Sequence, residues 1–113
     1  MVFIFSIQMK IVEDKYMLGE NARDNWDMLN QSKPEHYFFH LSSFPSAYVI
    51  LVCEGEPSQK EILRGAQICK ENTKYRNLKN LKVDYCPRSN VCRGEVTGEA
   101  IFISIKKVKQ VKV

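Results

Sequence analysis

Basic residues are concentrated in the second half of the chain, and their chemistry is that of phosphate binding. Residues 57–113 contain thirteen Lys and Arg against five Asp and Glu, a balance of +8, whereas residues 1–56 have a balance of −4. Such asymmetry indicates a polyanionic partner, because clustered cations release the counterions condensed on a nucleic acid. The cations are Lys60, Arg64, Lys70, Lys74, Arg76, Lys79, Lys82, Arg88, Arg93, Lys106, Lys107, Lys109 and Lys112.

Each part of this basic set also has a structural explanation. Charge runs in proteins usually form a solvated surface. Cations at the end of a helix, as predicted for Lys74 and Arg76, also interact favourably with the helix dipole. Both roles are compatible with phosphate binding, in which Arg76 would grip a phosphate through two hydrogen bonds and Lys74 would act as a point charge.

Two ring side chains, His40 and Tyr48, are candidates for contact with a base by stacking or hydrogen bonding. The alternative is that both are structural, since a lone His beside Phe39 is commonly a hydrogen-bonded core residue and Tyr is frequent in strands. His36 and His40 share a strand face but lie about 13 Å apart at the usual strand rise. The sequence therefore predicts no metal site here.

No motif of an enzyme or a cofactor site is present in the sequence. It contains no nucleophile elbow, Gly-rich phosphate loop or H-E-x-x-H. Its four cysteines lack the close pairing of zinc ligands and are predicted to be structural thiols. We therefore expect no catalytic residues, no metal and no cofactor. The four are Cys53, Cys69, Cys86 and Cys92.

Length and composition are those of one globular domain. The chain has 113 residues, of which 44% are hydrophobic and 27% charged. The apolar opening lacks a basic flank and a small-residue cleavage site, and no stretch reaches the roughly 18 apolar residues that a membrane span needs. These features predict a cytoplasmic protein without membrane association, and a nuclear location fits them equally.

The principal helix has the clearest signal. Ser58 and Glu61 form a capping box, which predicts a helix from this point to about Tyr75. Ile62, Ala66 and Cys69 fall on its apolar face. A shorter helix is predicted over 22–31. Strands are predicted at Val2–Ile7, Tyr16–Leu18, His36–Leu41, Ala47–Cys53, Leu81–Tyr85, Ala100–Ile105 and Val108–Val113, with a loop over Pro87–Gly98 containing a short strand near Val91.

This order of elements favours an α+β (mixed α/β) fold. One principal helix and a shorter one would pack on a mixed or antiparallel β-sheet, in a single domain over residues 1–113.

The segment PEHYFFHLSSFPSAYVIL at 34–51 places an aromatic pair before His40, and then Pro45 before Ser-Ala-Tyr-Val. It resembles the NFACT-R domain of the NFACT proteins of ribosome rescue, in which W-x-H-V is followed by P-G-S-H-V. The segments at 1–6, 19–29, 83–87, 89–91 and 98–102 (MVFIFS, GENARDNWDML, VDYCP, SNV and GEAIF) follow the family's order. Tyr48 stands where the family has His, and Glu20 where it has a basic residue.

The resemblance implies a non-catalytic RNA-binding module that acts on ribosomal or transfer RNA in translation or ribosome quality control. The large ribosomal subunit is then an expected partner, and DNA could bind the same surface. A protein-interaction adaptor whose basic half docks on an acidic partner is the alternative. The predicted RNA-binding residues are Lys60, Arg64, Lys70, Lys74, Arg76, Lys79, Arg88, Arg93, Tyr48 and His40.

Overall fold

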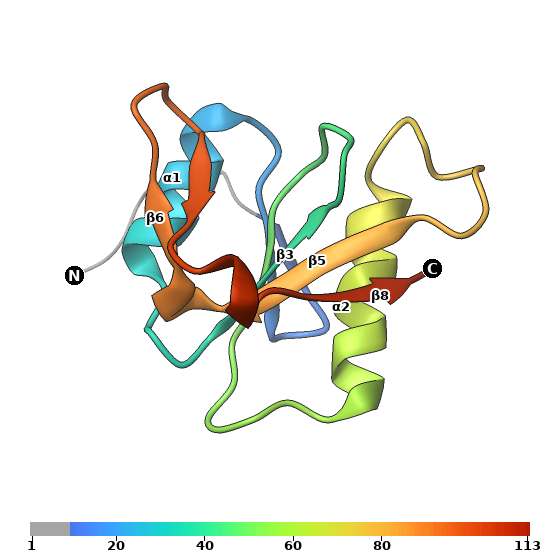
Figure 1. Cartoon of the computed structure of the whole chain (residues 1–113), viewed down its shortest axis with the longest axis horizontal. Coiled ribbons are helices and arrows are strands. Elements are labelled where there is room, and N and C mark those ends of the chain that lie inside the picture. Colours follow the sequence, from blue (N-terminus) through green and yellow to red (C-terminus); the bar gives the residue numbers. More distant parts are fainter. Residues whose placement is uncertain (1–9) are drawn as a thin grey trace.

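Six antiparallel strands form the central sheet, in the order β1-β2-β4-β3-β5-β8 (Figure 1). The computed structural model describes residues 10–113, so the predicted strand Val2–Ile7 lies outside the described residues. The strands are β1 (Lys10–Val12), β2 (Tyr16–Leu18), β3 (Tyr37–Leu41), β4 (Val49–Leu51), β5 (Lys82–Pro87) and β8 (Lys109–Lys112).

Both faces of the sheet are covered. Helix α2 (Gln59–Glu71) packs on one face, and α1 (Ala22–Gln31) packs on the other with a hairpin of β6 (Val91–Arg93) and β7 (Ala100–Phe102). Two short 3₁₀ helices, η2 (Arg88–Asn90) and η3 (Ile105–Lys107), flank this hairpin. Two helices on an antiparallel sheet confirm the predicted α+β fold.

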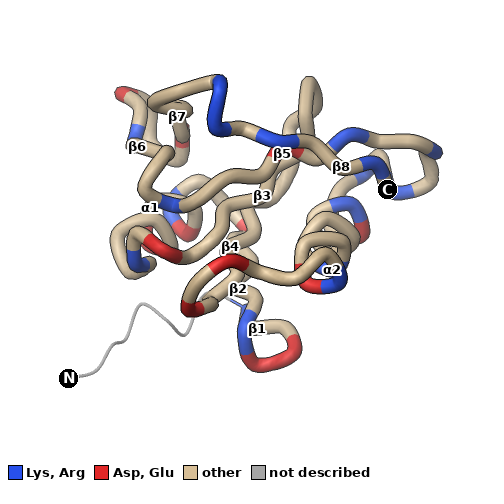
Figure 2. The backbone as a smooth tube through the Cα atoms, turned by 60° about the horizontal axis from the view of Figure 1, so that its bottom comes forward, with Lys and Arg blue, Asp and Glu red and all other residues tan. Residues whose placement is uncertain are grey.

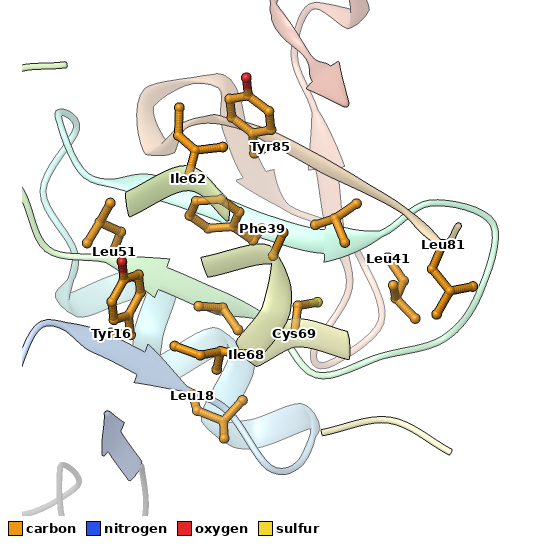
Figure 3. Close-up of a cluster of buried hydrophobic side chains, with 13 residues drawn as sticks. Tyr16, Leu18, Phe39, Leu41, Leu51, Ile62, Ile68, Cys69, Leu81 and Tyr85 are labelled. Carbon is orange, nitrogen blue, oxygen red and sulfur yellow. The ribbon is translucent and has the colours of Figure 1, made fainter. Parts of the chain in front are cut away.

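Alternation along β3 divides the core into two clusters. Phe39 and Leu41 point toward α2, where they meet Ile62 and Cys69 (Figure 3). Phe38, between them in the sequence, belongs to the cluster on the α1 side. Successive side chains of a strand point to opposite faces, so a strand of a sheet that is buried on both sides has a nearly continuous run of large, mostly apolar residues, as β3 does.

The capping box of α2 is confirmed, but the helix is shorter than predicted. The Ser58 Oγ accepts from the Glu61 backbone N–H at 3.1 Å, and the Glu61 carboxylate accepts from the Ser58 N–H at 3.0 Å. The helix ends at Glu71 and not near Tyr75, because Asn72 caps it by donating from Nδ2 to the Ile68 carbonyl at 2.8 Å. Lys74 and Arg76 therefore lie in the following loop and not on the helix.

Several strands begin or end at other residues than predicted. β4 is confined to Val49–Leu51, and β7 ends at Phe102 because η3 replaces the predicted continuation to Ile105. The short strand near Val91 is confirmed as β6. β1 was not predicted, since its three residues are largely exposed and show no alternation.

Gly65 allows α2 to approach the sheet closely. A Cβ at this position would lie 2.7 Å from the Cζ of Phe39, which is fully buried. We expect Gly65→Ala to lower the free energy of unfolding by about 2 kcal/mol through overpacking, although Ala is intrinsically the better helix former.

Urea denaturation of Gly65→Ala measures this effect. Gln67→Ala, in the same helix but outside the described core clusters, is the control and should change stability by less than about 0.5 kcal/mol. A Gly65→Ala protein as stable as the wild type would show that Phe39 can move aside.

Candidate nucleic-acid interface

Nine basic residues lie in the last turn of α2, the loop after it, β5, η3 and the edge strand β8. The backbone of these segments runs along one side of the molecule (Figure 2). Pairing of β5 with β8 makes Lys82 and Lys112 direct cross-strand partners. Within residues 10–113, none of the nine forms an ion pair. We call this set the basic ridge: Lys70, Lys74, Arg76, Lys79, Lys82, Lys106, Lys107, Lys109 and Lys112.

One carboxylate lies within the ridge. Asp84 shares a sheet face with Lys82 and Lys112, and its carboxylate accepts a hydrogen bond from the Gln110 amide at 2.8 Å. Lysines on an edge strand also discourage pairing with other chains. A row of like charges without partners is nevertheless unfavourable in the isolated protein, and a polyanion would relieve that repulsion.

Arg64 forms ion pairs with two carboxylates of the same chain and does not extend the ridge. Its guanidinium lies 2.7 Å from the Glu13 carboxylate and 3.4 Å from that of Glu71, and the hydrogen bond to Glu13 is the main cause that raises the pKa of Arg64. Lys60 is exposed, but it lies ten positions before Lys70 in the helix, or about 15 Å away. The structure thus leaves both predicted residues apart from the ridge.

Arg88 is also used internally. Its guanidinium donates to the Leu29 carbonyl at 2.8 and 3.1 Å, to the Ser32 hydroxyl at 3.1 Å and to the Val91 carbonyl at 2.6 Å. Burial lowers the pKa of Arg88 from its ordinary value. These bonds place a cation on the last carbonyls of α1, where the helix dipole favours it.

Arg93 lies on the hairpin, on the α1 side of the sheet. Its guanidinium carbon is 4.9 Å from the ring centroid of Trp26, a cation–π contact, and the Trp26 indole N–H donates to the Glu99 carbonyl at 2.9 Å. The pair fastens the hairpin to α1. Arg93 is exposed but does not belong to the basic ridge.

Tyr48 and His40 lie together on the α1 side of the sheet. The Tyr48 ring is 8% exposed and meets Phe38 and His40 edge to face, with centroids 5.0 and 5.1 Å apart. Burial raises the pKa of the Tyr48 hydroxyl. Its ring faces are not open for a base to stack on, so we do not include Tyr48 in the proposed interface.

Both histidines have a lowered pKa, with burial as the main cause. The charges nearby only partly compensate: Asp84 raises the pKa of His40, while Glu35 raises and Lys33 lowers that of His36. The His36 Nδ1 also accepts the Lys33 backbone N–H at 3.1 Å and must stay unprotonated to do so.

The sign of the pH dependence follows from these pKa values. The folded-state pKa of each histidine lies below its unfolded-state pKa, so the unfolded chain binds protons more readily. The contribution of the neutral histidines to stability is therefore fully present above a pH of about 6.5, and it is lost as the pH falls below that value. We expect denaturant midpoints to decrease from pH 7.5 to pH 5. The double variant His36→Gln/His40→Gln should flatten this dependence, and an unchanged slope would contradict the assignment.

A hollow of about 620 Å³ opens at the end of the sheet beside the ridge. Four connections meet there: β2 to α1, β3 to β4, α2 to β5, and the β6–β7 turn. Lys74 lies in its lining and so belongs to both the hollow and the ridge.

Residues 10–113 contain no group of three or more His, Cys, Asp or Glu placed to hold a metal ion. No helix in the same part of the chain is long and apolar enough to cross a membrane.

Comparison with known proteins establishes a likeness of fold. No family model and no curated protein matches the sequence. Among solved structures, the C-terminal part of the fibronectin/fibrinogen-binding protein from Streptococcus suis is similar, with a TM-score of 0.78 and 19% identity. The match covers 87% of this chain and 39% of that one, so this chain corresponds to less than half of the solved structure. At this identity the likeness concerns the fold alone.

Proposed function

We propose that this protein is a non-catalytic RNA-binding module of the NFACT-R type, which acts in the cytoplasm on ribosomal or transfer RNA. The observation that carries the proposal is the basic ridge, whose nine cations have no carboxylate partner in the part of the chain that the structure describes. Segments that carry the family resemblance, around Gly19, Pro45 and Gly98, line the hollow next to the ridge.

Binding would be mainly electrostatic. Cations along a sheet edge and a loop contact phosphates and sugars, so they recognise the shape and backbone of a folded RNA more than its sequence. Counterion release makes such binding steeply dependent on salt. Positioning of an RNA, and not a chemical step, is the role that follows.

Fluorescence anisotropy with labelled transfer RNA across a salt series tests the proposal, and sedimentation with large ribosomal subunits identifies the larger partner. We expect saturable binding near physiological salt and an affinity that falls linearly with salt on logarithmic axes. If neither transfer RNA nor ribosomes bind under these conditions, the proposal fails.

A protein-interaction adaptor is the second candidate, and the segment from β7 to η3 supplies a specific observation for it. Ile101, Ile103 and Ile105 alternate along one segment with their side chains exposed, 74% in the case of Ile105, and Lys106 and Lys107 follow them. Exposed apolar side chains beside cations suit an acidic, partly apolar protein surface. Ile103→Ser would weaken binding to such a partner while leaving RNA affinity unchanged.

A further inference from the structure

The hollow beside the ridge combines the features needed to hold one nucleotide. Its volume of about 620 Å³ lies within the range of small-ligand pockets. Leu18, Pro45 and Ala47 give it an apolar wall, against which a flat ring can pack. Lys74 at its lining can meet the phosphate attached to that nucleotide.

Two carboxamide oxygens of residues in the lining have no hydrogen-bond partner among the described residues, and one of them is accessible. The Asn25 Oδ1 is buried without a hydrogen-bond partner, the one side-chain N or O atom of residues 10–113 in that state. Asn72 donates its Nδ2 to the Ile68 carbonyl, and its Oδ1 has no partner among the described residues. Asn72 is an exposed residue, so a base in the hollow can reach its carboxamide, and carboxamides pair well with the donor and acceptor edge of a base. The buried Asn25 Oδ1 lies against Gly19 and is not offered as a base contact.

Two glycines bring the walls into close contact. A Cβ at Gly19 would lie 2.4 Å from the Asn25 Oδ1, and a Cβ at Gly98 would lie 2.6 Å from the Ala22 Cβ. Gly98 also has a φ of +91°, which L side chains rarely adopt. The β2–α1 connection and the β6–β7 turn are therefore packed tightly around the hollow, which is already formed in the free protein.

From this geometry we infer that the hollow receives one unstacked nucleotide of the RNA, with the base against the apolar wall and its phosphate on Lys74. The inference rests on the proposed function and adds a substrate class to it. The preferred RNA carries a bulge, loop or single-stranded end next to a helix, because a base within a regular helix cannot leave its stack without cost.

Two RNA hairpins that differ by a single bulged adenosine test the inference. The wild-type protein is expected to bind the bulged hairpin about tenfold more tightly, as a good contact to one base allows. Thr97→Met places a longer side chain on the lining of the hollow and is expected to abolish this preference. Val96→Met is the matched control: it changes the neighbouring exposed residue of the same turn, outside the lining, and should keep the preference.

Thermal unfolding establishes beforehand that both variants are folded like the wild type. Equal wild-type affinity for the two hairpins would overturn the nucleotide site while leaving RNA binding in place. A tenfold preference that survives in Thr97→Met would place base recognition elsewhere and would also overturn it. If the protein bound neither hairpin nor transfer RNA, this result would instead contradict the proposed function itself.

Discussion

Replacing Lys74, Arg76 and Lys79 together by Ala is expected to lower the affinity for transfer RNA about 100-fold at 0.1 M salt. The three side chains are exposed, lie within six residues of one loop and have no carboxylate partner among the described residues. Each cation that contacts a phosphate contributes about 0.7 to 0.9 to the slope of log affinity against log salt. Removing three such contacts should therefore reduce the slope by about two.

The matched control changes the net charge by the same amount elsewhere. Arg23, Lys33 and Lys60 are exposed basic residues outside the ridge, and they form no ion pair within residues 10–113. Their triple Ala variant should lose less than about fivefold in affinity, since long-range attraction alone is weak at this salt concentration. Equal losses in the two triple variants would show that net charge, and not the ridge, governs binding.

Neither triple variant should alter folding, because all six side chains are exposed. Denaturant midpoints that agree with the wild type within error would make the comparison of affinities valid. The salt series then separates two explanations. A parallel shift of the line would mean that the loop does not contact phosphates, whereas a lower slope identifies it as a contact surface.

Local signals in the sequence predicted the local structure well. The capping box at Ser58 marked the start of α2, and the apolar spacing of Ile62, Ala66 and Cys69 identified its buried face. The end of α2 was less predictable, because it depends on Asn72 bonding back to Ile68, and a single Asn has no strong helix-stop signal.

Contacts between distant segments determined the parts that the sequence did not predict. Lys82 and Lys112 were known as basic residues but were not predicted for the site, because only the pairing of β5 with β8 brings them together. Arg64 shows the opposite case, since it was predicted for the site but is paired within the protein. It lies among other cations in the sequence, yet Glu13, 51 positions away, lies beside it in the fold. Counting charges along a chain cannot distinguish these two situations.

Arg88 shows most clearly why a basic residue in a suggestive position need not be a binding residue. Its guanidinium joins the end of α1 to the start of β6 through contacts with Leu29, Ser32 and Val91. Pairing of β5 with β3 holds the adjacent Pro87 opposite Tyr37, so Arg88 is fixed at the point where the sheet, α1 and the hairpin meet. Removal of this side chain would take both guanidinium bonds from the Leu29 carbonyl, which would keep only the Ser32 hydroxyl at 3.1 Å among the described residues, and one bond from the Val91 carbonyl.

Arg88→Met is therefore expected to lower the free energy of unfolding by about 3 kcal/mol, since hydrogen bonds from charged donors contribute about 1.5 to 3 kcal/mol and several are lost together. Met keeps much of the apolar stem, so the loss reports the guanidinium. Arg88→Lys should recover only part of it, because one ammonium cannot reproduce the planar set of donors.

Urea denaturation measures these differences, and RNA binding at a temperature at which Arg88→Met remains folded separates the structural role from recognition. The variant should keep the wild-type affinity and the wild-type salt slope, because Leu29, Ser32 and Val91 already hold the guanidinium and engage three of its five N–H groups. A stable Arg88→Met protein with a reduced salt slope would contradict this assignment and return Arg88 to the binding surface. The expected opposite pattern, lost stability with unchanged RNA affinity, would confine recognition to the ridge and the hollow beside it.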